Sequence, residues 1–200
     1  NSFTFTVSAN PLNIPRFASV TISSSNLPTQ SVVIAQEGSP KTINVTPGGL
    51  STALTSGDLN NIFELILTGT IDARDFKTIR DDMGWLTKLD LSNVTIAAYS
   101  GTGGTANSYI NGKDYAANEI PLYAFIDPIK LLPKNSLSSI ILPNSATSID
   151  LGAFWLCNGL TTVYIPASIT SIALQAFECA SGLLTVDQNN INYSSLNGVL

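Results

Sequence analysis

The 200-residue chain contains no histidine, and this absence removes much of the chemistry that a protein can perform. Histidine is the commonest general base, completes the Ser-His-Asp and Cys-His arrangements, and supplies most zinc sites. Two carboxylate pairs remain, Asp72 with Asp75 and Asp81 with Asp82. Both fit the ends of a predicted helix, where capping and the helix dipole favour the first pair. We therefore predict no enzymatic activity, no catalytic residue, no metal and no cofactor.

Charged residues are also scarce, at 12% of the chain, and the nine basic and fourteen acidic side chains give a net charge of -5. No cluster of Lys and Arg could neutralise phosphates, which excludes nucleic acid as a partner. No apolar run approaches the roughly 18 to 20 residues of a transmembrane segment. Polarity comes mainly from Ser, Thr and Asn. We expect a secreted or cell-surface protein whose signal or lipid-anchor segment is not part of this chain.

What the chain does contain is an internal repeat. Segments 137–159 and 160–182 are each 23 residues long and share ten identities in register, and a third copy begins at Leu183. One such unit cannot bury its apolar face alone and must stack on its neighbours. The repeat predicts a β-rich α/β fold, a right-handed leucine-rich solenoid with an internal ladder. Its expected rungs are Leu137, Ile140, Leu142, Ile149, Leu151 and Phe154, stacked on Leu160, Val163, Ile165, Ile172, Leu174 and Phe177.

Only two cysteines are present, Cys157 and Cys179, at offsets that differ by one residue in consecutive copies. Stacking could bring them close enough for a disulfide. The one-residue difference turns the two side chains differently, and bridge geometry is strict. The sequence favours the alternative that each is a small buried apolar group.

Residues 1–40 form a separate β segment in this interpretation. Three short runs, 3–7, 18–23 and 31–36, alternate or are β-branched, and Asn and Pro separate them. Three strands have too little core to be stable alone. We expect a small β segment that packs either on further strands or on the solenoid.

Residues 41–200 form the predicted repeat domain, with a helical cap and degenerate repeats at 47–136 and regular repeats at 137–200. The pattern predicts short helices within 50–63, a strand at 65–67 and a helix at 70–83 with Asp72 as N-cap. A leucine-rich strand follows Leu86. An insertion rich in Gly, Asn and Tyr spans 97–118, and insertions in a solenoid lie on a face.

Two places could bind a partner. Outward strand positions form two expected columns, Lys88, Ser139, Thr162 and Thr185 in one and Asp90, Ile141, Tyr164 and Asp187 in the other. The insertion adds Tyr109 and Tyr115 in a loop composition typical of adaptable binding surfaces. The candidate binding residues are therefore Lys88, Asp90, Tyr109, Tyr115, Ile141, Tyr164 and Asp187. β-sheet propensity and packing of the tyrosines against the coil are the alternative explanations.

The repeats follow the pattern L-x-x-[IV]-x-[LI]-P-x-S-x-T-S-I-x-x-x-A-F, carried by 144–149 and 167–172 with Ala153-Phe154 and Ala176-Phe177. This pattern resembles the BspA-type leucine-rich repeat, also called the Treponema pallidum type. One departure is Ala180, which stands where the repeat usually has Cys. The resemblance implies a secreted or surface-attached protein of Bacteroides-like bacteria that binds host proteins, matrix or other bacteria.

The N-terminal segment carries a second resemblance, through Asn10, Arg16, Ala18, 20–23 and 30–38. These residues resemble the C-terminal half of a BACON domain, an immunoglobulin-like sandwich thought to contact carbohydrate or mucin.

Together the two resemblances imply a non-catalytic, adhesin-like protein that recognises a host or bacterial surface protein or glycan. A structural spacer or self-associating scaffold that displays another domain is the alternative. The regular repeats stop without a polar capping coil, which predicts an open end through which two copies could dimerise.

Overall fold

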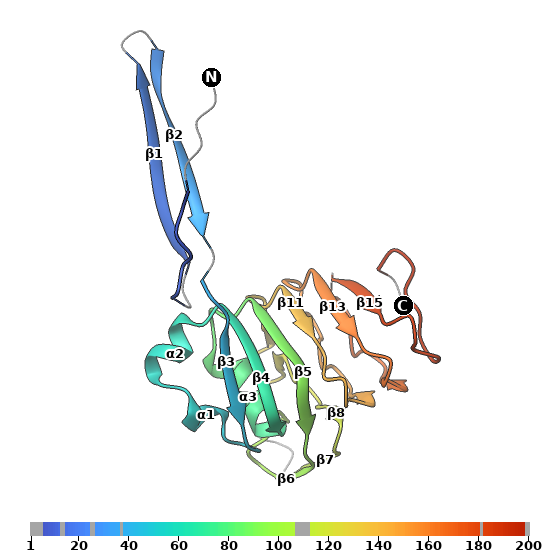
Figure 1. Ribbon diagram of the computed structural model, residues 1–200. Helices are drawn as coiled ribbons and strands as arrows, with labels where there is room; N and C mark the ends of the chain where they lie inside the picture. Colours follow the sequence, from blue (N-terminus) through green and yellow to red (C-terminus); the bar gives the residue numbers. More distant parts are fainter. Residues whose placement is uncertain are drawn as a thin grey trace.

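A six-stranded parallel sheet runs along the repeat part of the chain in this computed structural model (Figure 1). The structure describes residues 6–12, 15–24, 27–36, 38–106, 113–180 and 182–198. Every neighbouring pair of strands in this sheet is parallel, so consecutive coils lie side by side. In spatial order the strands are β3 (Lys41–Val45), β4 (Glu64–Ile71), β5 (Lys88–Ile96), β11 (Ser139–Ile141), β13 (Thr162–Ile165) and β15 (Leu183–Val186).

A second, narrower parallel sheet contributes to the same core. It contains β8 (Glu119–Ile120), β12 (Ser148–Ile149) and β14 (Ser171–Ile172). Ile120, Ile149 and Ile172 pair in register, as their equivalent offsets predict. Backbone contacts between the two regular copies join residues 23 positions apart, such as Thr170 and Thr147. A short antiparallel pair, β9 (Ile126–Asp127) and β10 (Leu132–Pro133), lies between the coils.

Three helices cover the first coils. α1 (Leu50–Ala53) and α2 (Ser56–Asn61) confirm the predicted short helices, and α3 (Ala73–Asp82) confirms the predicted longer one. Asp72 and Asp75 form a capping box at the start of α3. Asp75 also accepts hydrogen bonds from the backbone N–H groups of Gly48 (2.7 Å) and Leu50 (2.9 Å), which joins α1 to α3. Burial raises the pKa of Asp75.

Four phenylalanines stack through the core, one from each successive coil. Phe76 meets Phe125 edge-on at 6.1 Å between ring centroids. The rings of Phe125 and Phe154, and of Phe154 and Phe177, are stacked at 4.9 Å. Such aromatic pairs stabilise a core by about 0.5–1.5 kcal/mol beyond the area they bury. The predicted ladder is therefore present at the Ala-Phe positions.

Two rungs of the predicted ladder differ from the expectation. Leu174 is 86% exposed and Leu151 is only half-buried. Both lie in the turn that follows a two-residue strand. The equivalent Leu122 is buried, and there Thr105 of the insertion donates a hydrogen bond to its carbonyl oxygen (2.5 Å). Leu174 lies in the last of these three turns, and its side chain lies in solvent.

The last coil pairs in a register that the repeat does not predict. Thr162 lies opposite Leu183 and Tyr164 opposite Thr185, so the third copy is displaced by two residues. A shift of two keeps the same side chains on the same face of a strand. Leu184 and Val186 therefore still pack against the core, beside Val163 and Ile165. Asp187 consequently lies outside the column in which we expect it.

The C-terminal residues fold back along this last strand. The backbone N–H of Leu184 donates to the carbonyl oxygen of Gly198 (3.1 Å), and that of Val186 to the Ser195 hydroxyl (3.1 Å). Tyr193 packs against the core and accepts a hydrogen bond from the Ile172 N–H (3.0 Å). The last coil is therefore less open than the sequence suggests.

The N-terminal segment is a hairpin that projects away from the repeats (Figure 1). β1 (Arg16–Ser24) and β2 (Leu27–Gln36) pair antiparallel. Val7 lies in no strand, and the remainder of the predicted strand at 3–7 lies outside the described residues, apart from Thr6. The described part of this segment is thus one two-stranded sheet, where an immunoglobulin-like sandwich has two packed sheets.

Both cysteines are free, so they form no disulfide with each other. Cys157 is buried, as predicted, and burial raises its pKa to about 12. Cys179 is exposed, so the prediction that it is buried is wrong; it lies in a turn, and its backbone adopts a left-handed φ of 59°.

None of the helices among the described residues has the length and apolar character needed to cross a membrane.

Candidate functional site

The repeats present one side of the six-stranded sheet to solvent, and we call this side the outer sheet face. Leucines such as Leu65, Leu67 and Leu89 point into the core, so the residues between them point outward. α3 lies on the core side, because its Phe76 packs in the same cluster as these leucines. Two outward rows cross the sheet: Glu64, Lys88, Ser139, Thr162 and Leu183, and Thr42, Ile66, Asp90, Ile141, Tyr164 and Thr185.

Polar side chains of the first row interact with their neighbours across the strands. Lys88 Nζ lies 3.6 Å from a Glu64 carboxylate oxygen, a surface ion pair that contributes little stability. The Thr162 hydroxyl donates to the Ser139 hydroxyl at 2.9 Å. These contacts hold the polar row in a defined arrangement beside the second row.

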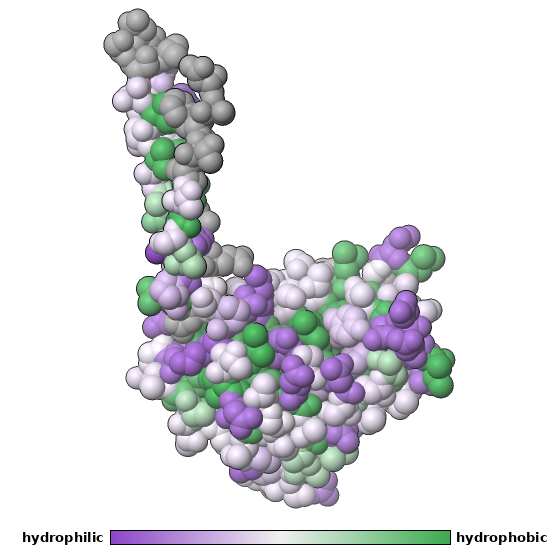
Figure 2. Space-filling model, viewed as in Figure 1, coloured by the Kyte–Doolittle hydropathy of each residue, from purple (hydrophilic) through white to green (hydrophobic). Residues whose placement is uncertain are grey.

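The second row places apolar groups around a carboxylate. Ile66 and Ile141 flank Asp90 on adjacent strands, and Ile141 is 36% exposed. Asp90 Oδ1 accepts a hydrogen bond from the Ser92 N–H (2.8 Å). Tyr164 lies next to Ile141 and is half-buried. Figure 2 shows apolar side chains interspersed with polar ones over this face.

Asp187 does not lie opposite Tyr164 in the sheet, but a hydrogen bond connects it to this surface. The Tyr164 hydroxyl donates to Asp187 Oδ2 at 2.6 Å. This bond raises the pKa of Tyr164 and lowers that of Asp187. The structure thus brings Asp90, Ile141 and Tyr164 together in one row and places Asp187 beside Tyr164.

Sequence reasoning missed Ile66. It lies inside the apolar run Leu65-Ile66-Leu67, where all three side chains look suitable for the core. Strand alternation was the available signal, because Leu65 and Leu67 cannot both point inward unless Ile66 points outward.

The insertion holds its tyrosines in a packed arrangement. β6 (Tyr99–Gly101) pairs antiparallel with β7 (Lys113–Tyr115), and the rings of Tyr99 and Tyr115 stack at 5.9 Å. Tyr115 is 4% exposed, and its hydroxyl accepts from the Ala106 N–H (2.7 Å). A Cβ on Gly104 would lie 2.5 Å from this ring. Packing therefore explains Tyr115, whereas Tyr109 lies outside the described residues.

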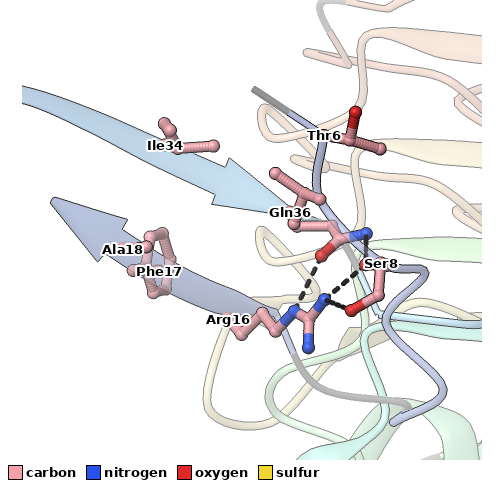
Figure 3. A pocket seen from close by; sticks show the side chains of 8 residues that line it. Thr6, Ser8, Arg16, Phe17, Ala18, Ile34 and Gln36 are labelled. Carbon is pink, nitrogen blue, oxygen red and sulfur yellow. Dashed lines mark hydrogen bonds between the residues drawn. The ribbon is translucent and has the colours of Figure 1, made fainter. Parts of the chain in front are cut away.

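A pocket of about 400 Å³ lies at the base of the hairpin (Figure 3). Arg16 donates to the Gln36 side-chain oxygen at 2.7 Å and to the Ser8 carbonyl oxygen, and Gln36 donates to that same carbonyl at 3.0 Å. Val7, Phe17 and Ile34 supply the apolar part of the wall. These hydrogen bonds tie residues 6–9 to the hairpin, so the polar wall of the pocket has a structural role.

Among the described residues, no group of three or more His, Cys, Asp or Glu side chains is arranged to hold a metal ion.

Comparison with known proteins supports the family resemblance for part of the repeats. Residues 118–197 match the family described as "BspA type Leucine rich repeat region (6 copies)". This stretch contains β8 and both regular copies, and the match supports the BspA-type resemblance for this part of the chain.

One similar solved structure is described as "The Crystal structure of Pneumococcal vaccine antigen PcpA". The two chains are 13% identical with a TM-score of 0.30, and the alignment covers 95% of this chain and 43% of that one. This chain therefore spans less than half the length of that protein. No curated protein matches the chain.

Proposed function

We propose that this protein is a non-catalytic, adhesin-like binding protein, secreted or attached to a bacterial cell surface, which recognises a partner through the outer sheet face. The partner is a host or bacterial surface protein, and a surface glycan is the second choice. The observation that carries the proposal is an exposed sheet with Ile66, Ile141 and Tyr164 at its centre and Lys88 and Asp90 among them.

The composition of this surface supports a protein partner. Cores of protein interfaces are enriched in aromatic residues and poor in charge, and a polar rim surrounds them. Tyr164 with the two isoleucines fits such a core, and the Ser and Thr side chains of the first row fit the rim. The match to BspA-type repeats supports a binding role and a location outside the cell.

We propose a right-handed solenoid with repeats of about 23 residues, because parallel strand crossovers are almost always right-handed. A β segment at 1–40, related to a BACON domain of Bacteroides-like bacteria, precedes the repeat domain at 41–200.

The test is binding of the purified chain to an array of host matrix proteins and mucin glycans. Tyr164→Ala and Ile141→Ala should each weaken saturable binding about tenfold or more, as truncation of central interface residues does. Ile191→Ala is the matched control, since Ile191 is a fully exposed isoleucine in the C-terminal segment. Unchanged binding by Tyr164→Ala and Ile141→Ala would exclude the outer sheet face.

A self-associating scaffold is the second candidate, and the hairpin favours it. Phe17 and Val33 lie exposed on one face of the hairpin, and Ile22 and Val32 on the other. Exposed apolar side chains on both faces favour contact with another molecule. A chain that binds nothing on the array and elutes as a dimer in size-exclusion chromatography would support this candidate.

A further inference from the structure

A second pocket, of about 200 Å³, lies against α3, and we call it the α3 pocket. Lys77, Arg80 and Asp81 line it from the helix, and Asp127 and Lys130 from the turn between β9 and β10. α3 lies on the core side of the sheet, so the α3 pocket is separate from the outer sheet face. Three of the nine basic side chains of the protein meet here.

Each carboxylate of the α3 pocket accepts three hydrogen bonds from neighbouring donors. Asp81 accepts from Arg80 Nε at 2.6 Å, from Arg80 Nη2 at 3.3 Å and from Lys77 Nζ. Asp127 accepts from the backbone N–H groups of Ile129 (2.9 Å) and Lys130 (3.1 Å) and from Lys130 Nζ (3.1 Å). Burial alone would raise the pKa of each carboxyl, but these hydrogen bonds lower it, so both stay ionised.

The guanidinium of Arg80 is bonded mainly to the protein itself. Its side chain is almost completely buried, and Nη1 donates to the carbonyl oxygens of Thr105 (2.8 Å), Tyr123 (3.1 Å) and Ile126 (3.1 Å). Arg80 therefore joins α3 to the insertion and to the next coil, and most of its donors are already bonded to protein acceptors.

The two lysines differ from Arg80. Each ammonium group has three N–H donors, and Lys77 and Lys130 each donate to one carboxylate among the described residues. Both side chains are substantially exposed. The α3 pocket therefore offers unused lysine donors beside carboxylates that each already accept three hydrogen bonds, and its three cations exceed its two anions by one charge.

We propose that the α3 pocket binds a small organic anion the size of a single sugar acid. The carboxylate or sulfate group of the ligand accepts hydrogen bonds from Lys77 and Lys130, while Pro128 and Ile129 contact its carbon skeleton. Pockets for drug-sized ligands occupy roughly 300–1,000 Å³, so this smaller pocket suits one ring. Charge-assisted hydrogen bonds are about twice as strong as neutral ones, which makes the ligand charge decisive.

The experiment is isothermal titration of the full chain with glucuronate, galactose 6-sulfate and neutral glucose. We expect saturable binding of at least one anion, with glucose at least tenfold weaker. The two anions distinguish a carboxylate from a sulfate ligand. Absence of saturable binding by both anions, or equal affinity for glucose, would overturn the proposal.

Three variants locate the site. Lys77→Gln and Lys130→Gln should each lower the affinity for the anion about tenfold, in line with a charge-assisted hydrogen bond. Lys41→Gln is the matched control, because Lys41 pairs with Asp58 of α2, and Lys41→Gln should leave binding unchanged. Full binding by the Lys77→Gln/Lys130→Gln double variant would place the anion elsewhere and refute the proposal.

Asp127→Asn tests whether the carboxylate of Asp127 competes with the ligand anion for Lys130. An asparagine oxygen still accepts from the backbone of Ile129 and Lys130, so the turn is retained. The change removes the charge that competes for Lys130, and we expect the affinity for the anion to rise several-fold. An unchanged or lower affinity would show that the ion pair with Lys130 does not compete with a ligand.

Discussion

At the scale of single residues, Phe154 is the phenylalanine of the stack whose loss should destabilise the protein most. This ring is fully buried between Phe125 and Phe177, whereas Phe177 has a ring partner on one side and is half-buried. Phe154→Ala should lower the free energy of unfolding by about 3–5 kcal/mol, as for other core aromatics. We expect a clearly smaller loss for Phe177→Ala, which urea denaturation would measure. Equal losses would mean that Phe177 is as well covered in solution as Phe154.

Because of Lys134, we expect the free energy of unfolding to rise with pH between pH 8 and 9. This lysine is buried and donates to the Met83 carbonyl oxygen at the end of α3, and burial lowers its pKa to about 8 from 10.5. Above pH 8 the folded state has lost a proton that the unfolded state keeps, so stability increases with pH. Between pH 8 and 9 the contribution of Lys134 alone is about 1 kcal/mol.

The window closes above pH 9 because Cys157 has the opposite effect. Its pKa is raised to about 12 from 9.0, so the folded state keeps a proton that the unfolded state loses, and stability falls as pH increases. Urea melts at pH 8 and 9 would test the Lys134 effect, with Lys134→Met as control. A rise of the same size in Lys134→Met would show that another group is responsible.

The role of a single residue could be predicted from the sequence where its partners are close in the chain. It could not be predicted where the burial of the residue depends on a segment far away in the chain. Asp72 is recognisable as a cap, because its partner Asp75 lies three residues away. The exposure of Leu174 and the burial of Tyr115 depend on which distant segment lies over them. Tyr115 is covered because Gly104 leaves room for its ring, a contact that no periodicity contains.

At the scale of elements, the hairpin contrasts with the strands of the repeat sheet. β1 and β2 form a separate sheet with exposed apolar residues on both faces. β4 and β5, in contrast, each bury leucines in the core. Two-stranded sheets are marginally stable in water. Backbone amides in β1 and β2 should therefore exchange hydrogen much faster than those in β4 and β5, as mass spectrometry would show. Equal protection would mean that a partner covers the hairpin in solution.

The repeat makes most elements of the solenoid predictable, and the exceptions have identifiable reasons. The strands at 65–67 and after Leu86 follow from leucine spacing, and α3 follows from its cap and apolar face. β3 was missed because KTINV has only a short alternation between two prolines. The register of β15 was missed because two registers satisfy the same alternation.

At the scale of the whole molecule, the two proposed sites are built from different parts of the structure. Equivalent positions of successive coils form the outer sheet face. Most residues of its second row could therefore be predicted from the repeat in the sequence. The α3 pocket is made by a helix, an insertion and a turn that have no counterpart in the regular copies. The sequence therefore indicated the first site and not the second.

The stacking of coils also decides how this protein responds to mechanical load. Hydrogen bonds between the parallel strands run along the stacking direction, so tension applied along that direction loads one strand pair at a time and not the whole sheet. A regular copy that detaches releases 23 residues, or roughly 80 Å of extended chain. A solenoid of this kind lengthens in steps under tension, so successive coils give way in turn while those still stacked keep their shape.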